Sequence, residues 1–375
     1  MTRKTILISI NAAWNIANFR SGLVAGLREA GYRVLALAPP DAHSERVRAL
    51  GVELFPLKMD RQGVSPAKDL LLQLRYHRAL RRLRPDVFLG FTAKPNIYGS
   101  LAAHALGIKV INNVSGLGTA FIRGGVLQAI LTRLYAIAFR RSSTVFFQNR
   151  DDLGLFVERR IVSPAQARLL PGSGVDIERF RPTEPDAGRS GAGFIFLLVG
   201  RLLWDKGVGE YVEAARLVRR SFPEARFQLL GFLEVANRTA VPRSAVDGWA
   251  AEGLIEYLGE SDDVRPAIAA ADCVVLPSYR EGLPRSLLEA AAMARPLIAT
   301  DVPGCRQVVE QGINGLLCTA RDAASLAEAM LAMLRMPDDE RRRFGAAGRA
   351  MVETVYDERI AVRFYLDAVG EALAR

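Results

Sequence analysis

The sequence is poor in the side chains that build cross-links and zinc sites. Its 375 residues include only three cysteines and three histidines. The cysteines, Cys273, Cys305 and Cys318, are odd in number and show no Cys-x-x-Cys spacing, which excludes a disulfide framework and a cysteine-rich zinc site. We therefore expect a reduced, cytoplasmic protein.

Long apolar runs are missing as well. No run approaches the roughly 20 residues that a membrane-spanning helix needs. The first ten residues have a basic flank but too short an apolar core for a signal peptide, so they predict a buried strand. What the chain does have is a globular composition, 50% hydrophobic and 24% charged, and enough length for two or three domains.

The net charge of +10 is unevenly distributed along the chain. Residues 1–190 hold 28 Lys and Arg against 14 Asp and Glu, a net charge of +14, whereas residues 191–375 hold 22 against 26, a net charge of −4. The excess gathers in two amphipathic stretches, 66–85 and 120–141, each predicted to be a helix. Basic amphipathic helices of this kind often bind anionic membrane surfaces. The alternative is a helix that packs on the core and exposes its arginine face to water. No nucleic-acid signature is present, so we expect no nucleic acid partner.

Short apolar runs alternate with helix-length stretches, which predicts an α/β fold of two Rossmann-like domains with parallel sheets. We expect two series of strands, over 5–10, 33–38, 87–91, 109–114 and 144–148, and over 194–200, 225–230, 255–258, 273–277 and 297–300. A segment rich in Pro, Gly and charge, 181–193, separates them. The predicted domains are 1–180 and 181–356, facing a cleft at the carboxyl ends of their strands, with a last helix over 357–375 that could pack on the first domain.

Two cations follow the first strand of the second series. Gly200 ends the strand, and Arg201 and Lys206 lie in the loop before a helix that can start near Gly207. Arginine holds phosphate oxygens bidentately and lysine supplies a compact charge, so the pair suits a diphosphate. Two solvated surface cations are the alternative.

A second strand–loop–helix unit begins at Cys273. Its loop carries Ser278, Glu281, Gly282 and Leu283, and the amides of Arg285 and Ser286 lie at the predicted helix start, where an anion is favoured. Glu289 is the one charge on an otherwise apolar stretch, and such a carboxylate needs hydrogen-bond donors, for which sugar hydroxyls would serve. A polar face turned to water is the alternative for Glu289.

These residues resemble the signature of a known enzyme family. Gly200-Arg201, Lys206-Gly207 and the pair Glu281 and Glu289 are similar to the motifs of retaining GT4 glycosyltransferases, which have the GT-B fold. The stretches 204–208, 276–284 and 114–119 look like the subgroup of bacterial GalNAc and HexNAc transferases that act on undecaprenyl-diphosphate-linked sugars. The resemblance covers nearly the whole chain.

The resemblance implies a role for each residue of the second domain. Arg201 and Lys206 would neutralise the diphosphate of a UDP-sugar donor, and Glu281 would bind hydroxyls of the transferred sugar. Glu289 would hold the ribose. Backbone and side-chain contacts to the nucleotide sugar would come from the remaining residues of the two loops, Gly200, Ser278, Gly282, Leu283, Arg285 and Ser286. The stretches 257–263 and 231–234 would frame the nucleobase.

Acceptor contacts are expected in the first domain, in loops after its strands. The candidates follow the first, third and fourth strands of that domain and are Asn18, Thr92, Lys94, Ser115 and Gly116. Many GT4 relatives carry a histidine in the region of 113–118, where this chain has Ser115-Gly116. The resemblance therefore favours front-face retention, in which the leaving phosphate itself accepts the acceptor proton.

Three further expectations complete the prediction. No Asp-x-Asp motif is present to hold a divalent metal on a donor diphosphate, so we expect no metal and no cofactor. No complete Gly-x-Gly-x-x-Gly fingerprint follows a strand, which disfavours an NAD-dependent oxidoreductase. A UDP-sugar epimerase or hydrolase of the same fold stays open. The predicted function is transfer of a HexNAc, with GalNAc favoured, from a UDP-sugar to an undecaprenyl-diphosphate-linked saccharide by an enzyme bound peripherally to the inner membrane face.

Overall fold

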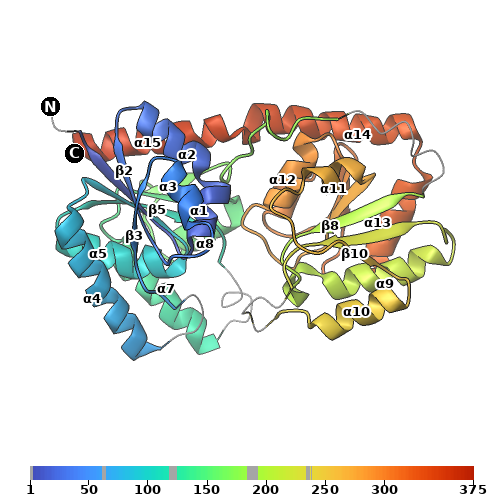
Figure 1. The fold of residues 1–375 in the computed structure, drawn as a ribbon, viewed down its shortest axis with the longest axis horizontal. Coiled ribbons are helices and arrows are strands. Elements are labelled where there is room, and N and C mark those ends of the chain that lie inside the picture. Colours follow the sequence, from blue (N-terminus) through green and yellow to red (C-terminus); the bar gives the residue numbers. More distant parts are fainter. Residues whose placement is uncertain (1–2, 61–64, 118–124, 184–192, 234–236, 238) are drawn as a thin grey trace. The chain divides into compact units, whose positions relative to one another are not determined.

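A computed structural model describes residues 3–60, 65–117, 125–183, 193–233, 237 and 239–375. The chain forms two compact units, drawn in Figure 1. Unit 1 comprises Met1–Gly174 and Glu358–Arg375, and unit 2 comprises Val175–Asp357. Residues 175–180, which were assigned to the first domain on sequence, belong to unit 2 because Val175, Ile177 and Phe180 pack into its core.

Unit 1 is built on a parallel sheet of seven strands in the order β3-β2-β1-β4-β5-β6-β7. The strands are β1 (Thr5–Ser9), β2 (Arg33–Ala38), β3 (Glu53–Pro56), β4 (Val87–Phe91), β5 (Lys109–Val114), β6 (Thr144–Phe147) and β7 (Ala167–Leu169). The central strands are buried on both faces, which explains why they read as continuous apolar runs.

Helices cover both faces of this sheet. They are α1 (Ala13–Phe19), α2 (Ser21–Glu29), α3 (Ser44–Ala49), α4 (Pro66–Leu83), the π-helical turn η1 (Pro95–Gly99), α5 (Ser100–Ala105), α7 (Gly125–Phe139), α8 (Arg150–Glu158) and α15 (Glu358–Ala374). Side chains alternate along a strand. Ile6 and Ile8 of β1 therefore pack with α2 and α15, whereas Leu7 packs with α4 and α5 on the other face (Figure 1).

Unit 2 repeats this design with a parallel sheet of six strands in the order β10-β9-β8-β11-β12-β13. The strands are β8 (Ile195–Val199), β9 (Arg226–Leu230), β10 (Glu256–Tyr257), β11 (Cys273–Leu276), β12 (Leu297–Thr300) and β13 (Gly315–Cys318). β8 and β11 are neighbours at the centre, so the loops that follow them leave the sheet side by side.

The helical segments of unit 2 again form two layers. They are η3 (Trp204–Lys206), α9 (Val208–Arg219), α10 (Arg243–Ala251), α11 (Arg265–Ala270), α12 (Arg285–Ala292), η4 (Cys305–Gln307), α13 (Ala323–Arg335), α14 (Asp338–Met351) and η5 (Val352–Tyr356). One core lies between the sheet and α12, and the other lies between the sheet and α9 and α13 (Figure 1).

The predicted α/β class is confirmed, and each of the ten predicted strands is present. Three further strands, β3, β7 and β13, were missed. All three lie at sheet edges. β3 and β7 are short and only partly buried, and their sequences, Glu-Leu-Phe-Pro and Ala-Arg-Leu, lack the continuous apolar run of a central strand. β13 does contain a short apolar run, Leu316 to Cys318, which was not assigned as a strand.

The last helix of the chain, α15, packs in unit 1 against α2. Tyr365 of α15 is buried beside Phe91 and Phe146, and its hydroxyl accepts a hydrogen bond from the Asn113 amide at 2.6 Å. Within the described part of the chain, no helix is both long enough and apolar enough to cross a membrane.

Candidate active site

The loop that follows β8 carries the first predicted donor-site residues. Gly200 and Arg201 leave the carboxyl end of the strand, and η3 leads to Gly207. Gly207 has a φ of 73°, and a Cβ there would overlap the carbonyl of Pro277 in the loop after β11. Glycine alone fits both the backbone conformation and this close approach. The two loops are therefore in direct backbone contact.

Hydrogen bonds join the same two loops. The backbone carbonyl of Asp205 accepts from the Tyr279 amide at 2.9 Å and from the Ser278 hydroxyl at 3.1 Å. Ser278, predicted to contact the nucleotide sugar, is buried and directs its hydroxyl at this backbone carbonyl. The Tyr279 hydroxyl donates to Glu210 at 2.6 Å. Burial first, and then the Glu210 carboxylate, raise the pKa of Tyr279, so the phenol remains a donor.

The central feature of the site is an ion pair between Lys206 and Glu281, one residue from each loop. The Lys206 ammonium donates a hydrogen bond to Oε1 of Glu281. Their side chains are only 21% and 13% exposed, so the two charges are largely withdrawn from water. Residues 75 positions apart in the sequence, both predicted to act on a donor, are thus in contact.

A third loop, after β12, supports the Glu281 backbone. The Glu281 amide donates to the carbonyl of Pro303 at 3.2 Å. Gly304 has a φ of 83°, and a Cβ there would lie 2.7 Å from the Glu281 carbonyl oxygen. Cys305 is fully buried; burial and the charge of Glu281 raise the pKa of its thiol, while Lys206 opposes the rise. This loop was not predicted from the sequence, although Pro303-Gly304, which begins three residues after the end of a predicted strand, was a usable signal.

The second predicted carboxylate lies on α12, which begins after Pro284. Glu289 accepts a hydrogen bond from Arg285 at 2.7 Å, and its side chain is 12% exposed. Burial raises the pKa of Glu289, and the Arg285 guanidinium opposes that rise. The Ser286 amide, in the first turn of α12, has no acceptor within the helix because a helix leaves its first amides unpaired. Both predicted donor-site carboxylates are therefore held by a cation of the same unit.

The loops expected to frame a nucleobase also meet. The Tyr257 hydroxyl, at the end of β10, donates to the backbone carbonyl of Gly231 at 2.9 Å. Gly231 follows β9, so the carboxyl ends of adjacent strands are joined at this edge. Residue 234, the last of that predicted stretch, lies outside the described residues.

Three of the remaining donor candidates differ in exposure. Gly282 is buried and Leu283 is half-buried beside Glu281. Arg201 is exposed, and its side chain forms no hydrogen bond or ion pair with any residue that the structure describes. It is thus a cation at the carboxyl end of β8 that remains available to an anion.

Thr92 is the most unusual acceptor candidate in unit 1. It directly follows β4, and its φ of 64° is rare for a β-branched residue. Its Oγ1 atom is buried and has no hydrogen-bond partner among the described residues. Strained backbone and unsatisfied polar atoms cluster at functional sites, which favours a binding role for this position.

Lys94 is engaged within unit 1. Its ammonium forms an ion pair at 2.8 Å with Asp69 of α4, and both side chains are largely buried. Lys94 was expected to contact the acceptor, and it would have to leave or share Asp69 to do so.

The other acceptor candidates lie at the same edge of the sheet, because β1, β4 and β5 are adjacent and parallel. Asn18 lies on α1 and donates to the Trp14 carbonyl at 3.0 Å. Ser115 and Gly116 directly follow β5; Ser115 is exposed and Gly116 has a φ of 135°. Over the described ranges, no group of three or more His, Cys, Asp or Glu is arranged to hold a metal ion.

Comparison with protein-family models gives two matches that follow one another along the chain. The model described as "Glycosyl transferase 4-like domain" matches residues 16–173, and the model described as "Glycosyl transferases group 1" matches residues 193–336. The first lies within unit 1 and the second within unit 2.

Two curated relatives span most of the chain. A Campylobacter jejuni protein named N,N'-diacetylbacillosaminyl-diphospho-undecaprenol alpha-1,3-N-acetylgalactosaminyltransferase is 26% identical over 371 residues, 95% of this chain and 96% of that protein. An Escherichia coli UDP-Gal:alpha-D-GlcNAc-diphosphoundecaprenol alpha-1,3-galactosyltransferase is 25% identical over 74% of this chain and 73% of its own.

Solved structures share the fold. The crystal structure of HepE from Anabaena in complex with UDP-glucose superposes with a TM-score of 0.80 at 17% sequence identity and covers 98% of this chain and 99% of that one. The two parallel-sheet units form the GT-B fold, and both matching family models describe glycosyltransferases. The chain belongs to the GT4-like, group 1 glycosyltransferases.

Proposed function

We propose that this glycosyltransferase moves an N-acetylhexosamine, with GalNAc favoured, from a UDP-sugar to a saccharide linked to undecaprenyl diphosphate, with retention at the anomeric carbon. The observation that carries the proposal is the Lys206–Glu281 pair. It places a cation suited to a departing diphosphate next to a carboxylate suited to sugar hydroxyls.

The donor diphosphate would be held by charges at the strand ends of unit 2. Arg201 is available, Lys206 can exchange its carboxylate partner for a phosphate oxygen, and the first-turn amides of α12, including that of Ser286, add donors. Breaking the sugar–phosphate bond develops negative charge on the diphosphate. One preorganised hydrogen-bond donor at such a position lowers the activation free energy by about 3 kcal/mol.

The ribose would bind at Glu289. Ribose hydroxyls donate to a carboxylate, and Glu289 already accepts a charge-assisted hydrogen bond from Arg285. A carboxylate has two oxygens, so Glu289 can keep Arg285 on one of them and accept the sugar on the other. Arg285 would then fix the orientation of the carboxylate.

Retention would follow from attack on the same face as the leaving group. The bond between the anomeric carbon and the phosphate oxygen breaks, a bond from that carbon to the acceptor oxygen forms on the same face, and the acceptor proton passes to the leaving phosphate. The Ser115-Gly116 sequence after β5 offers no imidazole for this proton transfer. Thr92, with its unpartnered Oγ1, is the side chain that we assign to an acceptor hydroxyl or phosphate.

The lipid-linked acceptor would be met at the inner face of the membrane, through α4 and α7. The inner face of α4 packs into unit 1 through Leu72, Tyr76 and Leu80. Its outer face exposes three leucines, Leu70 at 64%, Leu71 at 43% and Leu74 at 48%. Exposed leucines among arginines favour an anionic lipid surface, where each nearby cation contributes about 1 kcal/mol. Residues 120–124 of the second basic stretch lie outside the described residues.

One incubation tests the reaction against its nearest rival. The protein is mixed with radiolabelled UDP-GalNAc, UDP-GlcNAc or UDP-Gal, each with and without a lipid-linked diphosphate saccharide. Label that moves to the lipid fraction only when the acceptor is present, and fastest from UDP-GalNAc, supports the proposal. Equal consumption of the UDP-sugar without acceptor identifies an epimerase or hydrolase instead.

The membrane part of the proposal has its own test. Vesicles that contain phosphatidylglycerol should co-sediment the protein, and added salt should weaken the association because it screens surface charge. Co-sedimentation that is indifferent to anionic lipid and to salt would reject it.

A further inference from the structure

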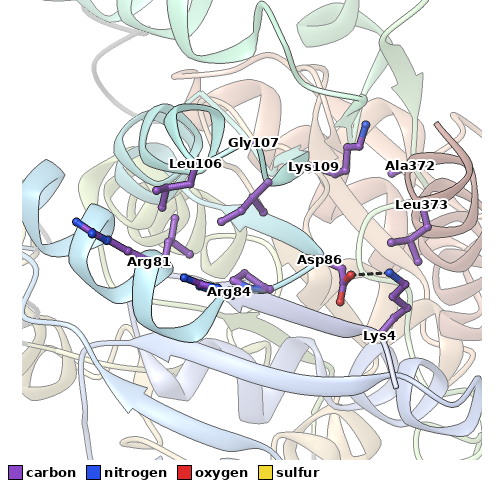
Figure 2. A pocket seen from close by; sticks show the side chains of 12 residues that line it. Lys4, Arg81, Arg84, Asp86, Leu106, Gly107, Lys109, Ala372 and Leu373 are labelled. Atoms are coloured by element: carbon purple, nitrogen blue, oxygen red, sulfur yellow. Dashed lines mark hydrogen bonds and ion pairs between the residues drawn. The ribbon is translucent and has the colours of Figure 1, made fainter. Parts of the chain in front are cut away.

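The amino ends of β1, β4 and β5 enclose a hollow in unit 1, at the edge of the sheet opposite the predicted acceptor residues. Its volume is about 610 Å³, within the range of small-molecule sites. Four cations surround it, and Figure 2 shows them on different sides, with Arg81 and Arg84 together and Lys4 across from them. The residues that line it are Lys4, Leu80, Arg81, Arg84, Pro85, Asp86, Leu106, Gly107, Ile108, Lys109, Ala372 and Leu373.

The single acidic group in this lining is already neutralised. Asp86 Oδ1 accepts from the Lys4 ammonium at 2.8 Å, and Oδ2 accepts from the Thr5 amide at 2.8 Å (Figure 2). Burial raises the pKa of Asp86, but these bonds outweigh it and the net shift is downward, so the carboxylate stays ionised and bound. It therefore does not compensate the remaining cations.

Three cations are left without a counter-charge. Arg81, Arg84 and Lys109 form no hydrogen bond or ion pair through their side chains with the described residues. Cations at a helix C-terminus are common because of the helix dipole, which accounts for Arg81 and Arg84. It does not account for Lys109, which begins β5. A net charge of +3 from two elements thus surrounds one hollow.

The backbone conformation of Arg84 allows a test that separates binding from folding. Arg84 ends α4 with a φ of 43° and a ψ of 55°, the left-handed conformation in which glycine is usual. A side chain costs stability in this conformation. Arg160 and Ala294 follow their helices in the same conformation, so at Arg84 it identifies a helix end where glycine would fit without strain.

The walls between the cations are apolar. Leu80, Pro85 and Ala372 are buried, and Leu106, Ile108 and Leu373 are partly buried. Cations at the edge of the hollow and apolar side chains along its walls suit a ligand that combines an anionic group with an apolar part. We propose that this hollow binds a phosphate group, supplied either by a soluble phosphate ester or by the head of an anionic lipid, at a site separate from both the donor and the acceptor residues.

Calorimetric titration of the full chain with inorganic pyrophosphate at low salt tests the proposal. Each of Arg81→Ala, Arg84→Gly and Lys109→Ala should weaken binding at the hollow by roughly tenfold, the effect of one lost charge-assisted hydrogen bond. Arg78→Ala is the matched control, because Arg78 is an exposed cation of α4 outside the lining, and it should change nothing. Pyrophosphate can also bind the donor loops, and Lys206→Ala removes that component separately.

Arg84→Gly separates binding from folding. Glycine relieves the left-handed strain, so this variant should keep or raise the melting temperature while it loses pyrophosphate affinity. A second arm uses dihexanoyl phosphatidic acid below its micelle concentration. Binding more than tenfold tighter than that of pyrophosphate identifies a lipid as the source, and equal binding identifies a soluble phosphate.

The outcomes are distinct. Pyrophosphate binding that is insensitive to all three hollow variants, or that disappears with Lys206→Ala alone, overturns the proposal. If the three hollow variants lose pyrophosphate binding and Lys206→Ala does not, the result supports the site in the hollow and counts against pyrophosphate binding at the donor loops.

Discussion

The Lys206 ammonium is hydrogen-bonded to the Glu281 carboxylate, and this ion pair links the loop after β8 to the loop after β11. Each partner neutralises a charge that would be costly to leave unpaired in a largely buried position. In the proposed reaction a nucleotide sugar would replace both halves of the interaction, because its diphosphate is an anion and its hydroxyls are donors. The ion pair would then hold these charges in place before a donor arrives.

The first prediction concerns that pair. Lys206→Ala and Glu281→Gln should each lower kcat for sugar transfer by about a hundredfold or more, since each removes a contact to the reacting groups. Lys206→Ala should also lower the melting temperature, because it removes the largely buried ion pair that links the two loops. Transfer assays and circular dichroism check both effects. Arg220→Ala removes an exposed cation of the same unit and should leave both quantities unchanged; near-normal turnover in either site variant would show that the site lies elsewhere.

The second prediction concerns pH. Because burial raises the pKa of Glu289, this carboxylate takes up a proton at higher pH than an ordinary glutamate. An ionised carboxylate accepts stronger hydrogen bonds than a neutral carboxyl, so if Glu289 holds the ribose, UDP affinity should fall as the pH drops through that raised pKa. Calorimetry from about pH 8 to about pH 5 measures it. Glu289→Gln cannot titrate and serves as control for protonation of UDP itself; identical pH profiles for the two proteins would contradict the assignment.

The parts of the site that could be predicted lie next to central strands. β8 and β11 are buried on both faces, so they read as continuous apolar runs whose ends fix the positions of Arg201 and Glu281. Since ligands of parallel sheets bind at carboxyl ends, the loop residues could be identified without knowledge of their contacts.

The partners of these residues could not be predicted in the same way. Lys94 and Asp69 are 25 residues apart, and nothing in the spacing distinguishes Asp69 from other acidic residues. The Arg285–Glu289 pair is different, because a separation of four on a helix brings side chains together, and that spacing was visible.

The third prediction concerns the supporting loop after β12. Gly304→Ala should destabilise the protein by about 2–4 kcal/mol, because a Cβ would strain the positive φ and collide with the carbonyls of Glu281 and Gly282. Relief of the collision would displace Glu281, so kcat should fall as well. Denaturant unfolding and transfer assays measure the two effects.

Gly248→Ala is the matched control for that substitution. Gly248 lies exposed within α10, and a Cβ there would meet no neighbour within 4 Å. Alanine should therefore stabilise this helix by about 0.5–1 kcal/mol and leave kcat unchanged. If both variants behaved alike, the close contact at Gly304 would not hold Glu281 in place.

The last prediction is that transfer needs no divalent metal. A metal on a donor diphosphate supplies positive charge and is usually held by oxygen ligands of acidic side chains. Here Arg201, Lys206 and the first-turn amides of α12 supply positive charge at the strand ends, and the two predicted donor-site carboxylates, Glu281 and Glu289, are each bound by a cation. Protein treated with EDTA and freed of it by gel filtration should therefore retain its full initial rate, and added Mg²⁺ or Mn²⁺ should change that rate by no more than about twofold, a salt-like effect on charged ligands. A protein that stays inactive after EDTA until one of these ions is restored would show that a metal shares the diphosphate with Lys206.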